Sequence, residues 1–243
     1  MTITVVRSVL FMLWFAVVTT VMSVVFLPVV VLPRRATVWM ARTWCRLTLA
    51  GLKICAGLDF EVRGFVPKGG VIVASKHMTM WDTLALYLLL DDPAMVTKRE
   101  LFRIPFYGWF LKSAGSIAVN REGHAGALRA LTVSAQKVVA AGRPVLIFPE
   151  GTRKKPGTKP DYKAGVAGLY NQLGVACAPV ALNSGLYWTG PGGFLKKRGK
   201  VIVEFLPLIP AGLKRTAFMQ TLQSRIEGAT ASLLREATTL PSE

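Results

Sequence analysis

Cysteine and histidine are both scarce in this chain of 243 residues. The three cysteines are an odd number without a Cys-x-x-Cys pair, and the two histidines lie far apart in the sequence. These counts argue against a disulfide scaffold, a zinc ribbon and a metal site built on several histidines. We therefore expect a protein of a reducing compartment that holds no metal ion.

Acidic residues are also few: 13, against 30 lysines and arginines, for a formal net charge of +17. An excess of this size predicts an anionic partner, namely nucleic acid, a membrane surface or a phosphorylated substrate. Apolar residues make up 52% of the chain, and the mean hydropathy is +0.43. A nucleic-acid-binding protein gains nothing from so apolar a composition, so we expect a membrane partner and no nucleic acid.

Charge is absent altogether from Ser8–Leu32, a run of 25 residues. As a helix the run would be ~37 Å long, against ~30 Å for the hydrocarbon core of a bilayer. It is longer than the apolar core of a signal peptide, and Pro33-Arg34-Arg35 follows in place of a small-residue cleavage site. We expect a membrane-embedded segment, either a tilted span or, because Pro28 interrupts it, a hairpin that re-enters one leaflet. The arginines after it place the rest of the chain in the cytoplasm.

Residues Ala36–Gly57 are expected to form an amphipathic helix. At ~100° per residue, four cations at this helix fall within about 40° of one another. They are Arg35, Arg42, Arg46 and Lys53. Such a stripe is typical of a helix in the headgroup layer of a membrane, and a surface helix packed on a soluble core is the alternative. We take residues 1–57 as a membrane-anchoring helical segment and residues 58–243 as an α/β domain.

From Leu58 onward, short β-branched runs alternate with helical patterns, which predicts a mixed α/β sheet with flanking helices. The expected strands are Leu58–Arg63, Val71–Ser75, Ala94–Thr97, Ser116–Asn120, Val145–Phe148, Val175–Ala181 and Val201–Leu206. The expected helices are Thr83–Leu90, Ala125–Ala141, Gly165–Leu173 and Leu213–Ala237.

His77 and Asp82 follow the second expected strand and are five positions apart. In one continuous helix they could not meet, but they converge if His77 lies in the turn and Asp82 in the first helical turn. A carboxylate on one imidazole nitrogen fixes the tautomer and makes the other nitrogen a better base. The chain has no Gly-x-Ser-x-Gly motif, and Cys177 lies in an expected buried strand. A base without a protein nucleophile should activate a hydroxyl group of the substrate.

A second motif, Phe148-Pro149-Glu150-Gly151-Thr152-Arg153, directly follows another expected strand. Open α/β sheets bind ligands in loops at this end of their strands. Gly151 permits close approach of the backbone, and the Arg153 guanidinium matches the geometry of a phosphate. The lysines that follow are expected to form a solvated basic loop.

Together these motifs resemble the lysophospholipid acyltransferase family with its His-x4-Asp motif, most closely the bacterial 1-acylglycerol-3-phosphate acyltransferases. Four blocks match in family order: His77 to Asp82; Lys98–Leu101 with Pro105–Gly108, Gly115 and Val119–Arg121; Phe148–Arg153; and Ala178–Ala181. Two departures stand out. Asn120 replaces a common Asp, and Met78 and Met80 make the first block unusually apolar.

The resemblance implies transfer of a fatty acyl group from acyl-CoA or acyl carrier protein to lysophosphatidic acid, giving phosphatidic acid without a metal or cofactor. It implies that His77 takes the hydroxyl proton and that Asp82 orients the imidazole. The substrate-binding residues would be Lys98, Arg121, Glu150, Gly151, Thr152 and Arg153, with Glu150 bonding the glycerol or bracing Arg153. Backbone N–H groups near Asp82 or Gly151 would bind the oxyanion. The location implied is the cytoplasmic face of a bacterial inner membrane.

Several alternatives stay open at this point. The acceptor could be another lysolipid, such as a lyso-aminolipid, or the chain could be a non-catalytic lipid-binding protein at the membrane. The aromatic run Phe106–Phe110 is either core packing or an apolar lip beside an acyl channel. The basic cluster Lys196–Lys200 is expected to be a solvated turn.

Overall fold

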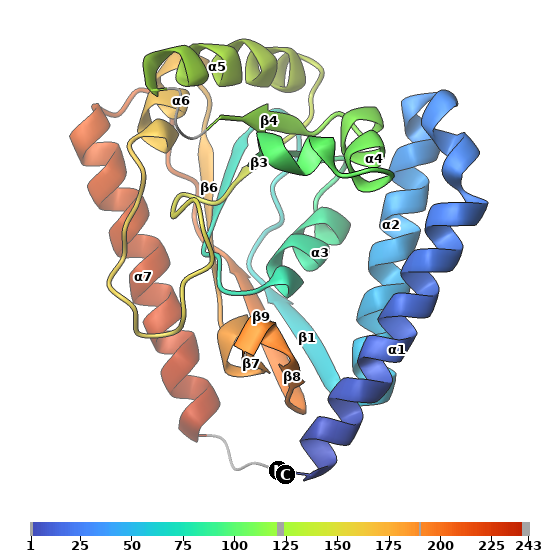
Figure 1. The fold of residues 1–243 in the computed structure, drawn as a ribbon. Coiled ribbons are helices and arrows are strands. Elements are labelled where there is room, and N and C mark those ends of the chain that lie inside the picture. The colour runs from blue at the N-terminus through green and yellow to red at the C-terminus, as the bar shows by residue number, and fades with distance from the viewer. Residues whose placement is uncertain (1, 121–123, 190, 240–243) are drawn as a thin grey trace.

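The computed structural model describes residues 2–120, 124–189 and 191–239. A central sheet separates two helical layers (Figure 1). One layer holds the N-terminal helix pair and α3, and the other holds α5, α6 and α7. The predicted α/β class, with a mixed sheet and flanking helices, is confirmed.

In the described part of the chain, seven strands form the main sheet, in the order β1-β9-β6-β2-β5-β3-β4. The five from β6 to β4 are parallel, and β9 joins them antiparallel through β6. Each lies within two residues of its expected bounds. The strands are β1 Leu58–Arg63, β2 Ile72–Ser75, β3 Ala94–Lys98, β4 Ile117–Val119, β5 Val145–Ile147, β6 Cys177–Leu182 and β9 Gly199–Phe205, and β7 Trp188–Thr189 and β8 Leu195–Lys196 form a separate hairpin.

The helices include one short element that the sequence pattern did not predict as a helix of its own, α4. The α-helices are α1 Thr2–Val25, α2 Arg34–Gly51, α3 Met80–Leu89, α4 Tyr107–Ser113, α5 His124–Ala140, α6 Gly165–Leu173 and α7 Arg215–Thr239. Shorter helical turns are η1 Leu27–Val31, η2 Leu52–Ala56, η3 Arg99–Arg103, η4 Ser184–Leu186 and η5 Pro191–Gly193.

The uncharged N-terminal run is not one straight helix. Helix α1 stops at Val25, η1 carries Pro28 in its first turn, and α2 runs back beside α1 (Figure 1). The Trp14 indole donates to the carbonyl of Leu47 at 2.9 Å, and a Cβ at Gly51 would overlap that indole. The close packing of the two helices therefore depends on glycine at this position.

The helix pair and the α/β domain share one hydrophobic core. Phe11, Leu49 and Leu52 lie in the same buried cluster as Trp81 of α3 and Val203 of β9. By length and composition α1 could cross a membrane, and only 17% of its most apolar stretch is buried. The sequence pattern changes at residue 57, but residues before and after this position pack into the same hydrophobic core.

The expected cationic stripe on α2 is only partly solvated. Arg42 donates to the carbonyls of Leu88 and Leu90 at 2.9 and 2.8 Å, so it binds the C-terminal end of α3. Trp44 packs between the two helices, and its indole N–H donates to the Thr19 hydroxyl at 3.0 Å. These contacts fix α2 to the domain as well as to α1.

The prediction of a solvated turn at Lys196–Lys200 is wrong for its first residue. Lys196 is 1% exposed, and its ammonium donates to the carbonyls of Gly193 and Phe194 and lies 4.3 Å from the Trp188 ring. Burial lowers its pKa to about 8. Its backbone N–H also donates to the Ser8 hydroxyl at 2.8 Å, which joins α1 to β8.

Candidate active site

The predicted site residues gather at one edge of the sheet. Strands β6, β2, β5, β3 and β4 are neighbours and parallel, so their C-terminal ends lie at the same edge. Ligands bind at this edge in open α/β sheets. His77 follows β2, Glu150 to Arg153 follow β5, and Lys98 ends β3. Arg121 lies outside the described residues.

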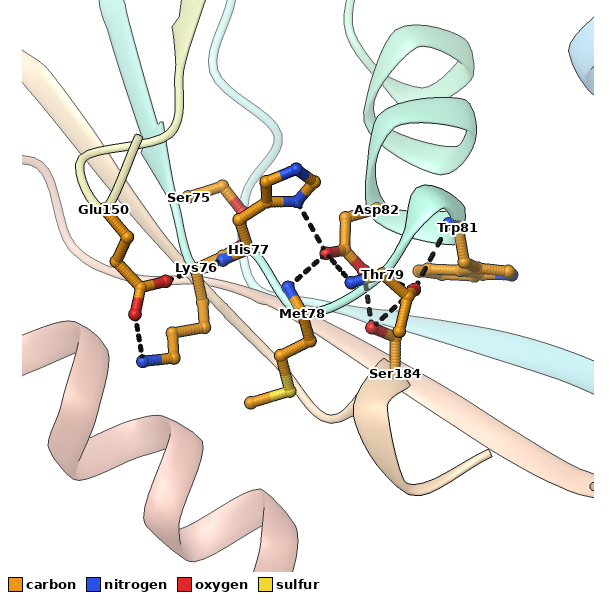
Figure 2. A network of polar contacts seen from close by, with 9 residues as sticks. All are labelled: Ser75, Lys76, His77, Met78, Thr79, Trp81, Asp82, Glu150 and Ser184. Atoms are coloured by element: carbon orange, nitrogen blue, oxygen red, sulfur yellow. Dashed lines mark hydrogen bonds and ion pairs between the residues drawn. The ribbon is translucent and has the colours of Figure 1, made fainter. Parts of the chain in front are cut away.

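His77 and Asp82 converge as the sequence predicts. Thr79 is the N-cap of α3, and it forms a capping box with Asp82, which lies in the first helical turn. The box turns the carboxylate back toward the preceding loop, where Asp82 Oδ2 lies 3.0 Å from His77 Nδ1 (Figure 2). The sequence Thr79-x-x-Asp82 is itself a helix-start signal.

Asp82 is fully buried and held by several donors. The backbone N–H groups of Met78 and Thr79 donate to Oδ2 at 2.6 and 2.9 Å, and the Ser184 hydroxyl donates to Oδ1 at 2.5 Å (Figure 2). These bonds fix the carboxylate plane, and through it the His77 ring. Ser184 is a positioning residue that sequence reasoning missed, because it lies 102 positions away.

This geometry leaves one nitrogen of His77 for chemistry. When the neutral ring donates its Nδ1 proton to Asp82, Nε2 carries the free lone pair. The ring stacks on Phe148 at 3.9 Å, and 12% of the side chain is exposed. Cys177 is no alternative nucleophile, since it is buried in β6 and burial raises its pKa to about 12. The site therefore leaves His77 Nε2 available to accept a proton.

Glu150, expected to bond the glycerol or to brace Arg153, is buried within the protein and bonded to two neighbouring groups. Its carboxylate is fully buried, accepts from the Lys76 ammonium at 2.8 Å and from the backbone N–H of His77 at 3.1 Å (Figure 2). Lys76 is 2% exposed and also donates to Glu227 of α7 at 2.8 Å. The Tyr162 hydroxyl donates to Glu227 as well, and burial raises the pKa of Tyr162. Glu150 thus holds the loop of His77 instead of bracing Arg153.

The loop after Glu150 is joined through its backbone to the turn that carries His77. Gly151 has φ +65°, which favours glycine, and its N–H donates to the Phe148 carbonyl at 2.9 Å. The Lys154 N–H donates to the His77 carbonyl at 2.8 Å. Thr152 and Arg153 between them are exposed. The backbone N–H groups of Met78, Thr79 and Gly151 are all bonded within the protein.

A large apolar cavity opens beside α3. It has a volume of about 490 Å³ and lies between the helix pair and α3 and α4. Thr83 and Leu84, directly after Asp82, line it together with Phe106 and Tyr107. Burial raises the pKa of the Tyr107 hydroxyl, and the charge of Arg153 opposes that rise. The aromatic run therefore contributes to a cavity wall in addition to its packing.

No group of three His, Cys, Asp or Glu side chains within residues 2–120, 124–189 and 191–239 could hold a metal ion. The polar groups at this edge of the sheet are His77, the Asp82 carboxylate bonded to it, and Arg153 in the loop after β5.

The chain belongs to the acyltransferase family, whose model, described as Acyltransferase, matches residues 59–183. It is 32% identical over 209 residues to the 1-acyl-sn-glycerol-3-phosphate acyltransferase of Pseudomonas aeruginosa, covering 85% of this chain and 81% of the relative. It is 28% identical to the human 1-acyl-sn-glycerol-3-phosphate acyltransferase alpha, over 80% of this chain and 70% of that one. The crystal structure of the 1-acyl-sn-glycerophosphate acyltransferase PlsC from Thermotoga maritima shares the fold, with a TM-score of 0.77 at 19% identity and 98% coverage of both chains. The protein is an acyltransferase.

Proposed function

We propose that the protein transfers a fatty acyl group to the free hydroxyl of 1-acyl-glycerol-3-phosphate, giving phosphatidic acid for membrane phospholipid synthesis. The observation that carries this proposal is the His77–Asp82 pair, in which no serine, threonine or cysteine among the described residues bonds to His77 Nε2. The names of the relatives support the choice of acceptor. The donor is a thioester, either acyl-CoA or acyl carrier protein, and we propose no metal or cofactor.

The reaction follows from the protonation of the pair. His77 Nε2 takes the proton of the acceptor hydroxyl as its oxygen attacks the thioester carbonyl. Asp82 stabilises the imidazolium that forms, in the same way that it holds the neutral ring. The tetrahedral intermediate then breaks its C–S bond, the ester remains, and the departing thiolate takes the proton from His77. Atoms and charges balance without a covalent acyl-enzyme.

Arg153 is the proposed phosphate ligand, with Lys98 and Arg121 as further cations. We expect Arg153→Ala to raise the KM for lysophosphatidic acid about tenfold or more, because a charge-assisted hydrogen bond contributes ~1.5–3 kcal/mol. Arg153→Lys should restore only part of the loss, because an ammonium lacks the planar fork. Steady-state kinetics with each substrate varied in turn measure this.

Lys159→Ala, an exposed lysine in the same loop, is the matched control and should change the acceptor KM little. If Arg153→Ala alters only the KM for the acyl donor, the assignment is wrong. An acceptor panel that includes lyso-aminolipids tests the alternative acceptor class, and inactivity with every acceptor would favour the non-catalytic lipid-binding protein.

The apolar cavity is the proposed site for an acyl chain. Its volume falls within the range of ~300–1,000 Å³ that is usual for ligand pockets, and its walls continue from Asp82 toward the helix pair. An acyl chain that entered there would place its carbonyl near the base.

We propose that the helix pair embeds in one leaflet of the bacterial inner membrane, with the domain on its cytoplasmic face. Helix α1 is packed along α2 and bonded to β8, and α2 is bonded to α3. A helix held in this way cannot cross the bilayer without drawing the domain with it. Its exposed apolar face, including Val17 and Val24, is left for lipid.

Full-length protein on vesicles should remain bound in ~1 M salt, where exposed charges are screened within ~3 Å, and should need detergent for release. Val17→Glu with Val24→Glu should make binding sensitive to salt, since both side chains lie on the exposed face of α1. Vesicle flotation across a salt series measures this.

Val133→Glu on α5, another exposed valine, is the control and should float like the native protein. Release of native protein by salt alone would contradict embedding.

A further inference from the structure

A basic pocket lies on the outer side of α2, where α2 meets the C-terminal end of α3. It has a volume of about 270 Å³, and four guanidinium groups face a single carboxylate, that of Asp92, in its lining. The arginines are Arg34, Arg35, Arg42 and Arg46. None of the residues assigned to catalysis or to the acceptor lines it, since His77 and Asp82 lie at the N-terminal end of α3.

Two of these arginines are held in place by the domain. Arg34 donates through both terminal nitrogens to Asp92, at 2.7 and 2.6 Å, and Arg42 binds the last carbonyls of α3. Arg143 also donates to Asp92. The one carboxylate of the pocket is therefore shared between two arginines, and the guanidinium of Arg42 has no carboxylate partner.

The other two arginines are uncommitted. Within the described part of the chain, the side chains of Arg35 and Arg46 make no hydrogen bond or ion pair with another residue. Helix α2 has no acidic residue, so the repulsion between Arg42 and Arg46, one turn apart, is not relieved along the helix. An anion bound between these guanidinium groups would relieve the repulsion, and no acidic side chain of α2 does so.

The surroundings of the pocket indicate what kind of anion it takes. Trp39 lines the pocket, is 55% exposed and packs against Phe26 at the end of α1. Val31 and Leu32, just before α2, are 86% and 51% exposed. Charge and exposed apolar surface adjoin, which fits a ligand with a phosphate group and acyl chains better than a soluble anion.

We propose that this pocket binds the phosphate group of an anionic membrane phospholipid, separately from the acceptor at the active site. Arg42 and Arg46 hold the phosphate, Arg35 adds a further cation, and Trp39 lies at the level of the ester groups. A lipid bound there contacts both α2 and, through Arg42, the end of α3. The proposal rests on the proposed embedding of the helix pair in the membrane.

The test uses full-length protein in neutral detergent, carrying Arg153→Ala so that the proposed acceptor site binds anions less tightly. Native mass spectrometry measures binding of phosphatidylglycerol and of phosphatidylcholine with the same chains. We expect phosphatidylglycerol to bind at least about tenfold more tightly, and Arg35→Gln with Arg46→Gln to abolish that preference. Arg129→Gln with Lys137→Gln, at two exposed cations of α5, removes the same amount of charge. This control variant should keep the preference for phosphatidylglycerol.

Three results would overturn the proposal. The first is a preference unchanged in the α2 variant, and the second is an equal loss in the α5 control, which would mean general attraction between charges. The third is displacement of phosphatidylglycerol by glycerol 3-phosphate at similar concentration, which would mean a site for soluble phosphates. Lipid binding is measured here without any acyl transfer. A native enzyme that transfers no acyl group would therefore contradict the proposed function and leave this binding result unaffected.

Discussion

Replacing His77 by alanine should lower turnover by about 10²–10⁴, the usual contribution of a general base. The ring lies at the edge of the fold and 12% of the side chain is exposed, so the variant should fold. Asp82→Asn should also lose most turnover, because an amide presents a donor to groups that already donate to Oδ2. Initial rates on mixed micelles, with circular dichroism to verify folding, measure both.

Two further observations bear on the mechanism. Acid quenching during turnover should trap no acyl group on native protein, because the acceptor oxygen attacks the thioester directly. Ser184→Ala should keep the base but lower kcat with little change in the acceptor KM, because it removes one donor that fixes the Asp82 carboxylate. Near-native turnover in His77→Ala, or a trapped acyl-enzyme, would refute the mechanism.

Replacing Lys76 by methionine should destabilise the fold by ~3–5 kcal/mol, because breaking a buried ion pair leaves an uncompensated charge. Lys76 bridges Glu150, which is fully buried, and Glu227. The loss should also reduce kcat, since Glu150 holds the backbone N–H of His77. Urea unfolding in a fixed detergent measures the stability change.

Lys163→Met provides the matched control, because its ion pair with Asp161 is solvent-exposed and should contribute little to stability. Adding Glu150→Gln to Lys76→Met should recover part of the lost stability, as expected for residues that interact directly. An equal loss of stability in the Lys163 and Lys76 variants would show that burial of the ion pairs of Lys76 with Glu150 and Glu227 is unimportant.

The sheet could be predicted from sequence because its strands are short, β-branched and bounded by turn residues. The convergence of His77 and Asp82 was also predictable, since a strand-to-helix turn and a capping box are local features. The path of the N-terminal run was not settled, because apolar composition fits a span and a hairpin equally well. The structure folds the run into a helix pair that contacts α3 and β8, and these contacts depend on residues far along the chain.

The burial of Glu150 and of Lys196, which the sequence pattern did not predict, has a common cause. A charged residue after a strand, or in a basic cluster, is usually solvated, and the sequence does not show which way its side chain turns. Glu150 is buried because Lys76 compensates it, and Lys76 in turn depends on Glu227, 151 positions away. Lys196 is buried because two carbonyls and Trp188 receive its ammonium.

The bond between Ser8 and Lys196 has a consequence for how the chain is made. Its partners are 188 positions apart, so at ~5–20 residues per second roughly 10–40 s pass between their synthesis. During that time the apolar face of α1 has neither β8 nor the β9 core to pack against. A nascent chain that meets the bilayer first would protect this face, and the domain would then assemble on a helix pair already in place. Refolding in water, where nothing covers α1, should instead lead to aggregation.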